Sequence, residues 1–240
     1  MFSIEATSLH HQALNERIRA GERELTVENV LGQRFIAAGM SDKRIDIHGT
    51  PGNALGAYLD GAVINVFGNA QDAVGDTMNA GQINVFGNIG DAPGYAMRGG
   101  RIYVKGDAGY RAGIHMKAYR DHIPVLMIGG KTGSFLGEYQ AGGIIVVLGL
   151  ADDDRDIVGN FPCTGMHGGR MFLRSSCERI RFPHQVTARP ASPEDMNAVT
   201  EHIRTFCDIF GYDAEWVLDA DFTVITPDSK NPYQQMYVAN

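Results

Sequence analysis

The chain has 240 residues, of which 44% are hydrophobic, so it is long enough to bury a core in one large domain or two small ones. Its formal net charge is −7 and its Lys and Arg residues form no cluster, which excludes the basic surface of a protein that binds nucleic acid or an anionic membrane. No basic and then apolar leader begins the chain, and no segment has the roughly 20 apolar residues of a membrane span. We therefore expect a soluble, cytoplasmic protein.

The first 44 residues predict a helical cap. The stretch HHQALNERIRAG has a helical pattern of apolar positions, and Gly21 is a plausible stop signal. A shorter helix-like stretch lies near TVENVLGQRF. We expect residues 1–44 to cover one end of the domain that follows.

A repeat of about 19 residues organises the middle of the chain. The string INVFGN occurs at residues 64–69 and again at 83–88. The glycines that end each short apolar run are spaced by 19, 19, 19, 24 and 19 residues. They are Gly49, Gly68, Gly87, Gly106, Gly130 and Gly149. Such a period indicates a stack of similar turns rather than a local accident.

Further glycines follow the first one at spacings of three and then four residues. These structural glycines are Gly49, Gly52, Gly56, Gly87, Gly90, Gly94, Gly106, Gly109, Gly113, Gly130, Gly133 and Gly137. We expect them at the corners of the turns, where a Cβ would clash or where φ must be positive.

The run before each corner alternates apolar and other residues, as a β-strand does. The expected inward pairs are Ile45/Ile47, Ile64/Val66, Ile83/Val85, Ile102/Val104, Leu126/Ile128, Ile145/Val147 and Met171/Leu173. One such unit cannot bury a core alone, but stacked units share one. Residues 45–182 therefore predict a mostly β fold, a single-stranded β-helix of about seven turns.

Two insertions interrupt the repeat, and insertions in a solenoid map to surface loops. The first is AYRDHIP at 118–124, and the second is LADDDRDIVGNFPCTGMHGG at 150–169. Their charged residues are candidate partner contacts: Arg120, Asp121, His122, Asp153, Asp154 and Arg155. The acidic run itself predicts a solvated loop. Gln140, which replaces the Met or Leu of other turns, predicts a more open edge of the solenoid.

Residues 183–240 predict a helix and a tail. Ser192 is a candidate N-cap followed by Pro193, and apolar residues continue at helical spacing until Gly211. The tail adds two further candidate partner contacts, Tyr233 and Tyr237.

No catalytic, cofactor-binding or metal-binding set emerges from the residues. The three cysteines, Cys163, Cys177 and Cys207, form no CxxC pair, and their odd number argues against a disulfide framework. We expect buried thiols. His167 lies near Cys163, but two residues do not make a metal site.

The segments GNIGDAPGYAMRGGRIYVKGDAGYRAGIHMK and GGKTGSFLGEYQAGGIIVVLG resemble the GXGXG domain of the large subunit of glutamate synthase. The ending TVITPDSKNPYQQMYVAN looks like the tail of free-standing versions of that domain. The resemblance implies a right-handed β-helix. It implies a non-catalytic subunit of a split glutamate or N-methylglutamate synthase, in a hetero-oligomer. Its partners would be a class II glutamine amidotransferase subunit and a synthase subunit that carries FMN and an iron–sulfur cluster.

Two alternatives remain open. A similar glycine-repeat solenoid is the C-subunit of formylmethanofuran dehydrogenase and of the related formyltransferase/hydrolase complex. A free-standing scaffold protein is the other. A hexapeptide acyltransferase is disfavoured, because the 19-residue period has no hexapeptide rhythm.

Overall fold

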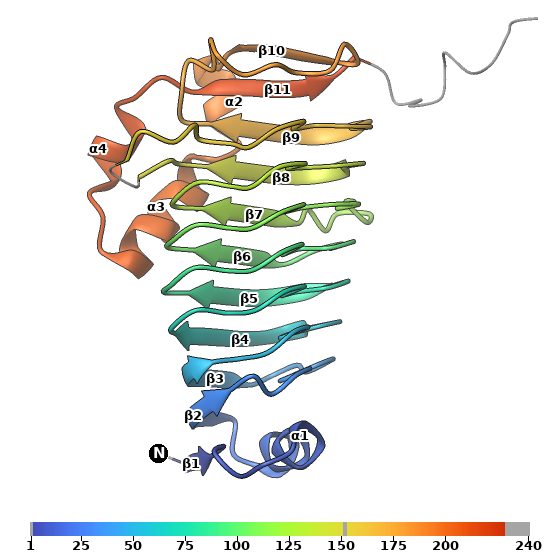
Figure 1. The fold of residues 1–240 in the computed structure, drawn as a ribbon, viewed down its shortest axis with the longest axis vertical. Coiled ribbons are helices and arrows are strands. Elements are labelled where there is room, and N and C mark those ends of the chain that lie inside the picture. Colours follow the sequence, from blue (N-terminus) through green and yellow to red (C-terminus); the bar gives the residue numbers. More distant parts are fainter. Residues whose placement is uncertain (1, 151–152, 229–240) are drawn as a thin grey trace, which may run out of the picture.

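A computed structural model describes residues 2–150 and 153–228. They form a parallel β-solenoid of about eight turns, in which strands β1 to β9 stack in chain order (Figure 1). The parallel strands are β1 (Phe2–Glu5), β2 (Glu24–Leu31), β3 (Arg44–Thr50), β4 (Asp60–Phe67), β5 (Ala80–Val85), β6 (Arg101–Val104), β7 (Val125–Ile128), β8 (Ala141–Val147) and β9 (Gly168–Leu173). The predicted β-solenoid is therefore confirmed.

The core of the solenoid is the apolar ladder expected from the repeat. In β3, β4 and β5, for example, Ile45 pairs with Ile64 and Ile64 with Ile83. All fourteen side chains of the seven expected pairs have no solvent exposure. The duplicated INVFGN thus forms two adjacent rungs. The first asparagine of each copy, Asn65 or Asn84, faces the other side of the sheet, where Asn84 Nδ2 donates to Asn65 Oδ1 over 2.7 Å.

The first glycines of each turn make room for the turn before, for its backbone in some turns and for an Asn or Asp side chain in others. Asp91 Oδ1 accepts a hydrogen bond from the N–H of Tyr110 over 2.7 Å, and it lies over Gly109. A Cβ on Gly109 would overlap that oxygen and would also approach the Gly90 carbonyl within 3.0 Å. The backbone of Gly109 is not in the positive-φ region. Close approach therefore requires this glycine, not an unusual backbone angle.

The last glycine of each turn is required for a different reason. Gly56 has a φ of +63°, and Ala54 and Tyr58, two residues before and after it, also have positive φ. A Cβ on Gly56 would lie 2.6 Å from Ile83 Cδ1, which fills the interior one turn further on. This position therefore needs glycine both for its backbone conformation and for the width of the core.

The N-terminal end differs from the expected helical cap. The segment 1–44 contains helix α1 (His11–Ala20), but β1 and β2, which flank this helix, add two more parallel strands to the N-terminal end of the sheet. Helix α1 places Leu14 and Ile18, both fully buried, against the end of the core. The apolar positions of β2 continue the ladder, since Val27 pairs with Ile47.

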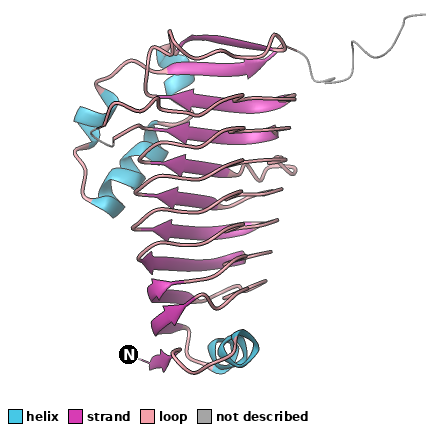
Figure 2. Ribbon diagram, viewed as in Figure 1, coloured by secondary structure: helices cyan, strands magenta, loops and turns pink. Residues whose placement is uncertain are grey.

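The C-terminal end is closed by two antiparallel strands. Strand β11 (Thr223–Pro227) lies between β9 and β10 (Val186–Pro190), antiparallel to both (Figure 2). The sheet order is therefore β9-β11-β10, with the later strand inside.

The single helix expected between Ser192 and Gly211 is wrong in one respect, because two helices occupy the segment. Helix α2 (Pro193–Met196) has the expected capping box, in which Ser192 and Asp195 exchange hydrogen bonds. Hydrogen bonds from residue i to residue i−3 then follow, and in one of them the Val199 N–H donates to the Met196 carbonyl. Helix α3 (Thr200–Phe210) begins after them. Gly211 ends α3 with a φ of +76°.

Helix α3 forms a second apolar layer on the outer face of the sheet. Its buried Ile203, Phe206 and Phe210 pack with Tyr103 and Phe172 from the strands. Helix α4 (Ala214–Leu218) follows on the same side of the solenoid (Figure 1). The layer covers strands β6 to β9, and the chain thus has one core inside the solenoid and one outside it.

We predict that Gly109→Ala lowers the free energy of unfolding by about 3 kcal/mol, since the added methyl overlaps Asp91 Oδ1 and the Gly90 backbone. Gly39→Ala is the control, because Gly39 has a φ of +65° but no atom within 4 Å of an added Cβ. Its cost should be only about 1 kcal/mol. Urea unfolding measures both.

Adding Asp91→Ala to Gly109→Ala removes one of the two overlaps. The double variant should therefore cost less than the sum of the two single variants. Strictly additive costs, or equal costs for Gly109→Ala and Gly39→Ala, would contradict this account of the glycine.

Candidate functional site

A ladder of Asn and Asp side chains runs along one corner of the solenoid. Asn69 Oδ1 accepts from the Asn88 N–H over 2.8 Å, and Asn88 Oδ1 accepts from the Asp107 N–H over 2.8 Å. Asp107 Oδ1 then accepts from the Lys131 N–H, also over 2.8 Å. Each turn therefore fixes the backbone of the next through one side chain.

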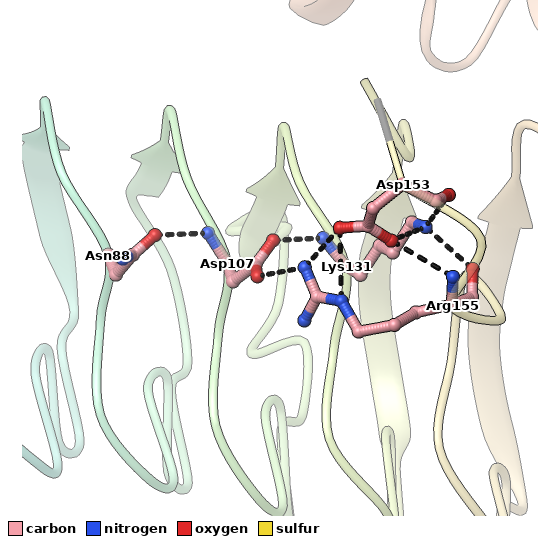
Figure 3. Close-up of polar contacts among 5 residues, drawn as sticks. All are labelled: Asn88, Asp107, Lys131, Asp153 and Arg155. Carbon is pink, nitrogen blue, oxygen red and sulfur yellow. Dashed lines mark hydrogen bonds and ion pairs between the residues drawn. The ribbon is translucent and has the colours of Figure 1, made fainter. Parts of the chain in front are cut away.

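The ladder ends at Lys131, which occupies the Asn or Asp position of its turn (Figure 3). Lys131 is 6% exposed, and its Nζ donates to the carbonyl of Arg155 over 2.6 Å, to that of Asp153 over 2.7 Å and to the Asp153 carboxylate. Arg155 in turn bridges Asp153 and Asp107, with Nη2 2.7 Å from Asp107 Oδ2. The second insertion is thus tied to the corner ladder. We call Asp107, Lys131, Asp153 and Arg155 the corner cluster.

Electrostatics in the corner cluster favour the charged forms. Hydrogen bonds from Arg155, and then from Lys131, hold the pKa of the Asp153 carboxyl well below its usual range. The same bond to Asp153, with that to Asp107, raises the pKa of the Arg155 guanidinium. Asp153 and Arg155 are therefore both charged at neutral pH and form an ion pair.

Residues 153–156 are exposed, as expected for a solvated loop, but two of them also bind other parts of the chain. Asp153 and Arg155 are bound within the chain, although the Arg155 side chain is still 60% exposed. Asp154 is exposed. Their roles as partner contacts stay predictions. The sequence could not show that residues 24 positions apart, Lys131 and Arg155, meet through a backbone carbonyl.

The first insertion folds into a tight turn just before β7, whereas the residues of the corner cluster follow the strands. Tyr119 and His122 exchange two backbone hydrogen bonds of 3.0 Å, and the Arg120 guanidinium lies 5.2 Å from the Tyr119 ring centre. Asp121 and His122 line a hollow of about 520 Å³ together with Arg101 and His202. The structure therefore brings two of the candidate contacts to one place, beside α3.

His202 in this hollow is bound to a buried tyrosine. Its Nδ1 lies 3.1 Å from the Tyr103 hydroxyl. Burial raises the pKa of Tyr103 to about 12, and burial, with the Arg101 charge nearby, lowers the pKa of His202. The neutral imidazole and the neutral phenol therefore share a hydrogen bond at ordinary pH.

Exposed and half-buried aromatic side chains form two columns on the stacked turns, which were not predicted. Tyr110, Phe135 and Phe161 make one column, with ring centres 5.2 and 5.3 Å apart. Tyr95, His115 and Tyr139 make the other, at 6.0 and 5.2 Å. Arg111 lies between them, 2.8 Å from Glu138. We call the six rings and Arg111 the aromatic columns; these seven residues are Tyr95, Tyr110, Arg111, His115, Phe135, Tyr139 and Phe161.

A signal for the columns is present in the repeat. The position filled by Ala54, Ala73 and Ala92 in three successive turns holds Arg111, Phe135 and Phe161 in the later ones, and Phe35 in the turn before them. Phe161 is 64% exposed. The change from alanine to larger residues in one stacked position thus distinguishes the surface of the later turns from that of the three turns before them.

Two interior residues deviate from the repeat without opening it. The expectation that Gln140 marks an open edge is wrong, because Gln140 has no exposure and its Nε2 donates to the carbonyls of Gly142 and Gly143 over 3.2 Å. Cys163 occupies the slot of the last glycine and is also fully buried, which raises the pKa of its thiol to about 12. All three cysteines are free and buried, as expected.

Tyr233 and Tyr237 lie outside the described residues. Within 2–150 and 153–228, no group of three or more His, Cys, Asp or Glu side chains is placed to hold a metal ion. No helix in that part of the chain has the length and apolar character to cross a bilayer.

The comparisons with known proteins agree with the glycine geometry. The family model described as the GXGXG motif matches residues 7–228. The chain belongs to the GXGXG family. The match includes the glycine corners, the Asn and Asp ladder and both insertions.

Two further proteins resemble this GXGXG chain. Uncharacterized protein MJ1350 of Methanocaldococcus jannaschii is 41% identical over 248 residues, which are 98% of this chain and 95% of that protein. A chain of the formyltransferase/hydrolase complex (FhcABCD) of Methylorubrum extorquens, solved in complex with methylofuran, has a TM-score of 0.63. It is 16% identical, and the match covers 91% of this chain and 88% of that one. At this identity the likeness shows the fold.

We predict that the second insertion loosens in acid. Because the folded-state pKa of Asp153 is lowered, its stabilising contribution is fully present above its unfolded value of about 4 and is lost as the pH falls below it. Amide hydrogen exchange of residues 153–158, corrected for intrinsic rates, should show constant protection above that pH and declining protection below it. Asp153→Asn, which lacks the charge, should show low protection and no pH step. A step that persists in Asp153→Asn would assign it to another group.

Proposed function

We propose that this chain is a non-catalytic subunit that joins a class II glutaminase subunit to an FMN-dependent synthase subunit, in a complex that makes glutamate or N-methylglutamate. Membership of the GXGXG family and the resemblance of its motifs to glutamate synthase support this function. FMN and an iron–sulfur cluster would belong to the synthase partner.

The observation that carries a joining role is the pair of aromatic columns. Tyr, Phe and Arg are the residue types enriched in the buried centres of protein interfaces. Tyr95, Tyr110 and Tyr139 are each more than a third exposed, and Arg111 is exposed between them. The stacked turns hold these rings at fixed separations, so little side-chain entropy remains to be lost when a partner covers them.

The hollow beside the first insertion supplies a second, separate surface. Asp121, His122 and Arg101 are polar and lie on the sheet side, whereas the aromatic columns lie on the stacked turns. Two different surfaces fit a subunit that touches two different partners. Arg120, Asp154, Tyr233 and Tyr237 remain candidate contacts in the same proposal.

A second candidate function follows from the fold likeness to a chain of the formyltransferase/hydrolase complex. In that case the partners would be formyltransferase and hydrolase subunits. The resemblance of the glycine segments to glutamate synthase favours the first candidate.

We predict that the tagged chain, co-expressed with the glutaminase and FMN subunits of its own genome, co-elutes with both in size-exclusion chromatography. Tyr110→Ser/Phe161→Ser should weaken binding to one of them by about tenfold, because it removes exposed aromatic contact area. Leu31→Ser/Tyr58→Ser is the matched control, since both residues are exposed and lie outside the aromatic columns.

Other outcomes separate the candidates. Co-elution with formyltransferase and hydrolase subunits instead would support the second candidate. Binding to none of these subunits would sink both, and equal losses in the two double variants would remove the columns from the proposal.

We also predict that the purified chain alone has no flavin absorbance between about 350 and 500 nm and no glutaminase activity, since both would reside in the partners. The assembled complex is the positive control. Stoichiometric FMN in the isolated chain would contradict a joining subunit without catalytic chemistry of its own.

A further inference from the structure

We propose that a hollow between the second insertion and the segment after β9 binds a small organic anion, one with a carboxylate or phosphate group on an apolar body. The hollow has a volume of about 500 Å³, which lies in the usual range of small-molecule sites. It is distinct from the hollow beside the first insertion.

The charge of the lining points to an anion. Lys131, Arg155, Arg179 and Arg181 line the hollow, against a single lining carboxylate, that of Asp156. The chain as a whole carries a formal charge of −7, so this concentration of cations is local. Opposite charge in a concave site raises the local concentration of an anionic ligand.

Two of the four cations are available for a ligand. Lys131 and Arg155 are already bound to Asp153 and Asp107 in the corner cluster (Figure 3). Among the described residues, no carboxylate lies within 4 Å of the Arg179 or Arg181 guanidinium. A guanidinium presents paired N–H donors that match the two oxygens of a carboxylate or phosphate.

A buried hydroxyl in the same lining also lacks a partner. Thr132 is 7% exposed, and its Oγ1 is buried with no hydrogen-bond partner among the described residues. Because this oxygen has almost no accessible surface, a ligand in the hollow would not reach it, and the proposal is carried by the cations and the apolar side chains of the lining.

The remaining lining explains why the anion should be organic. Phe161, Pro162 and Ile180 line the hollow together with Val158. A purely inorganic anion would leave these apolar side chains in contact with water. An aromatic or aliphatic body on the anion would cover them, with the charged group toward Arg179 and Arg181.

Isothermal titration of the full chain with phenyl phosphate and with phenylacetate tests the proposal. At least one should bind saturably at one site per chain, and the tighter one identifies phosphate or carboxylate as the recognised group. Benzyl alcohol, which has the ring without the charge, should not bind. Inorganic phosphate should bind about tenfold more weakly than phenyl phosphate, because it lacks the apolar body.

Two variants locate the site. Arg179→Gln/Arg181→Gln should weaken binding by about tenfold or more. Arg17→Gln/Arg98→Gln, with the same change of charge at exposed positions elsewhere, should leave binding unchanged. Thr132→Val should leave binding unchanged, because the hydroxyl oxygen is not accessible from the hollow.

Absence of saturable binding by either organic anion up to about 10 mM would overturn the proposal. Equal weakening in the two arginine double variants would also overturn it, because binding would then follow net charge. The arginine side chains are exposed, so circular dichroism should show an unchanged fold. None of these measurements needs a partner subunit, so failure here is distinguishable from failure of the joining role.

Discussion

The structure depends on one constraint, that each turn of backbone lies directly on the turn before it. Neighbouring strands are held about 4.8 Å apart by their hydrogen bonds, so a residue meets the residue one repeat away before any other. Side chains that repeat at 19 residues must therefore pack against copies of themselves. Isoleucine and valine do so inside, and Asn, Asp and aromatic rings do so at the corners and on the turns. Most of the glycines follow from the same close stacking, since they leave room for the backbone or the side chain of a neighbouring turn.

The same constraint decides what the sequence reveals. The apolar pairs were predictable because their period is also the period of the strands, and register then places every pair. The Asn and Asp ladder was not predicted, since nothing in a string such as Gly106-Asp107 says that the carboxylate bonds the backbone of the next turn. The extra strands β1 and β2 were missed because they lack the glycine corners by which the repeat was recognised.

The candidate surfaces were harder to predict than the fold. Insertions were correctly found as breaks in the repeat, but a break does not show whether its charges face a partner or the chain itself. Asp153 and Arg155 bind the chain's own Lys131 and Asp107, whereas Asp121 and His122 line an open hollow. Six of the seven residues of the aromatic columns lie within regular turns and only Phe161 lies in an insertion, so breaks in the repeat do not point to them. Candidate surfaces in this solenoid thus arise from substitutions in ordinary positions as well as from insertions.

The position of β11 has a consequence for the order in which the chain is completed. Residues 223–227 lie between β9 and β10, although both of those strands are synthesised earlier. Until β11 leaves the ribosome, β9 presents an open edge, and β10 has no place in the sheet. An open edge at the end of a long parallel stack is a template for the strand of another molecule. Strand β11 therefore covers the edge of β9 and holds β10 in the sheet. A chain that ends before Thr223 would leave the backbone N–H and C=O groups of the β9 edge unpaired and open to another molecule.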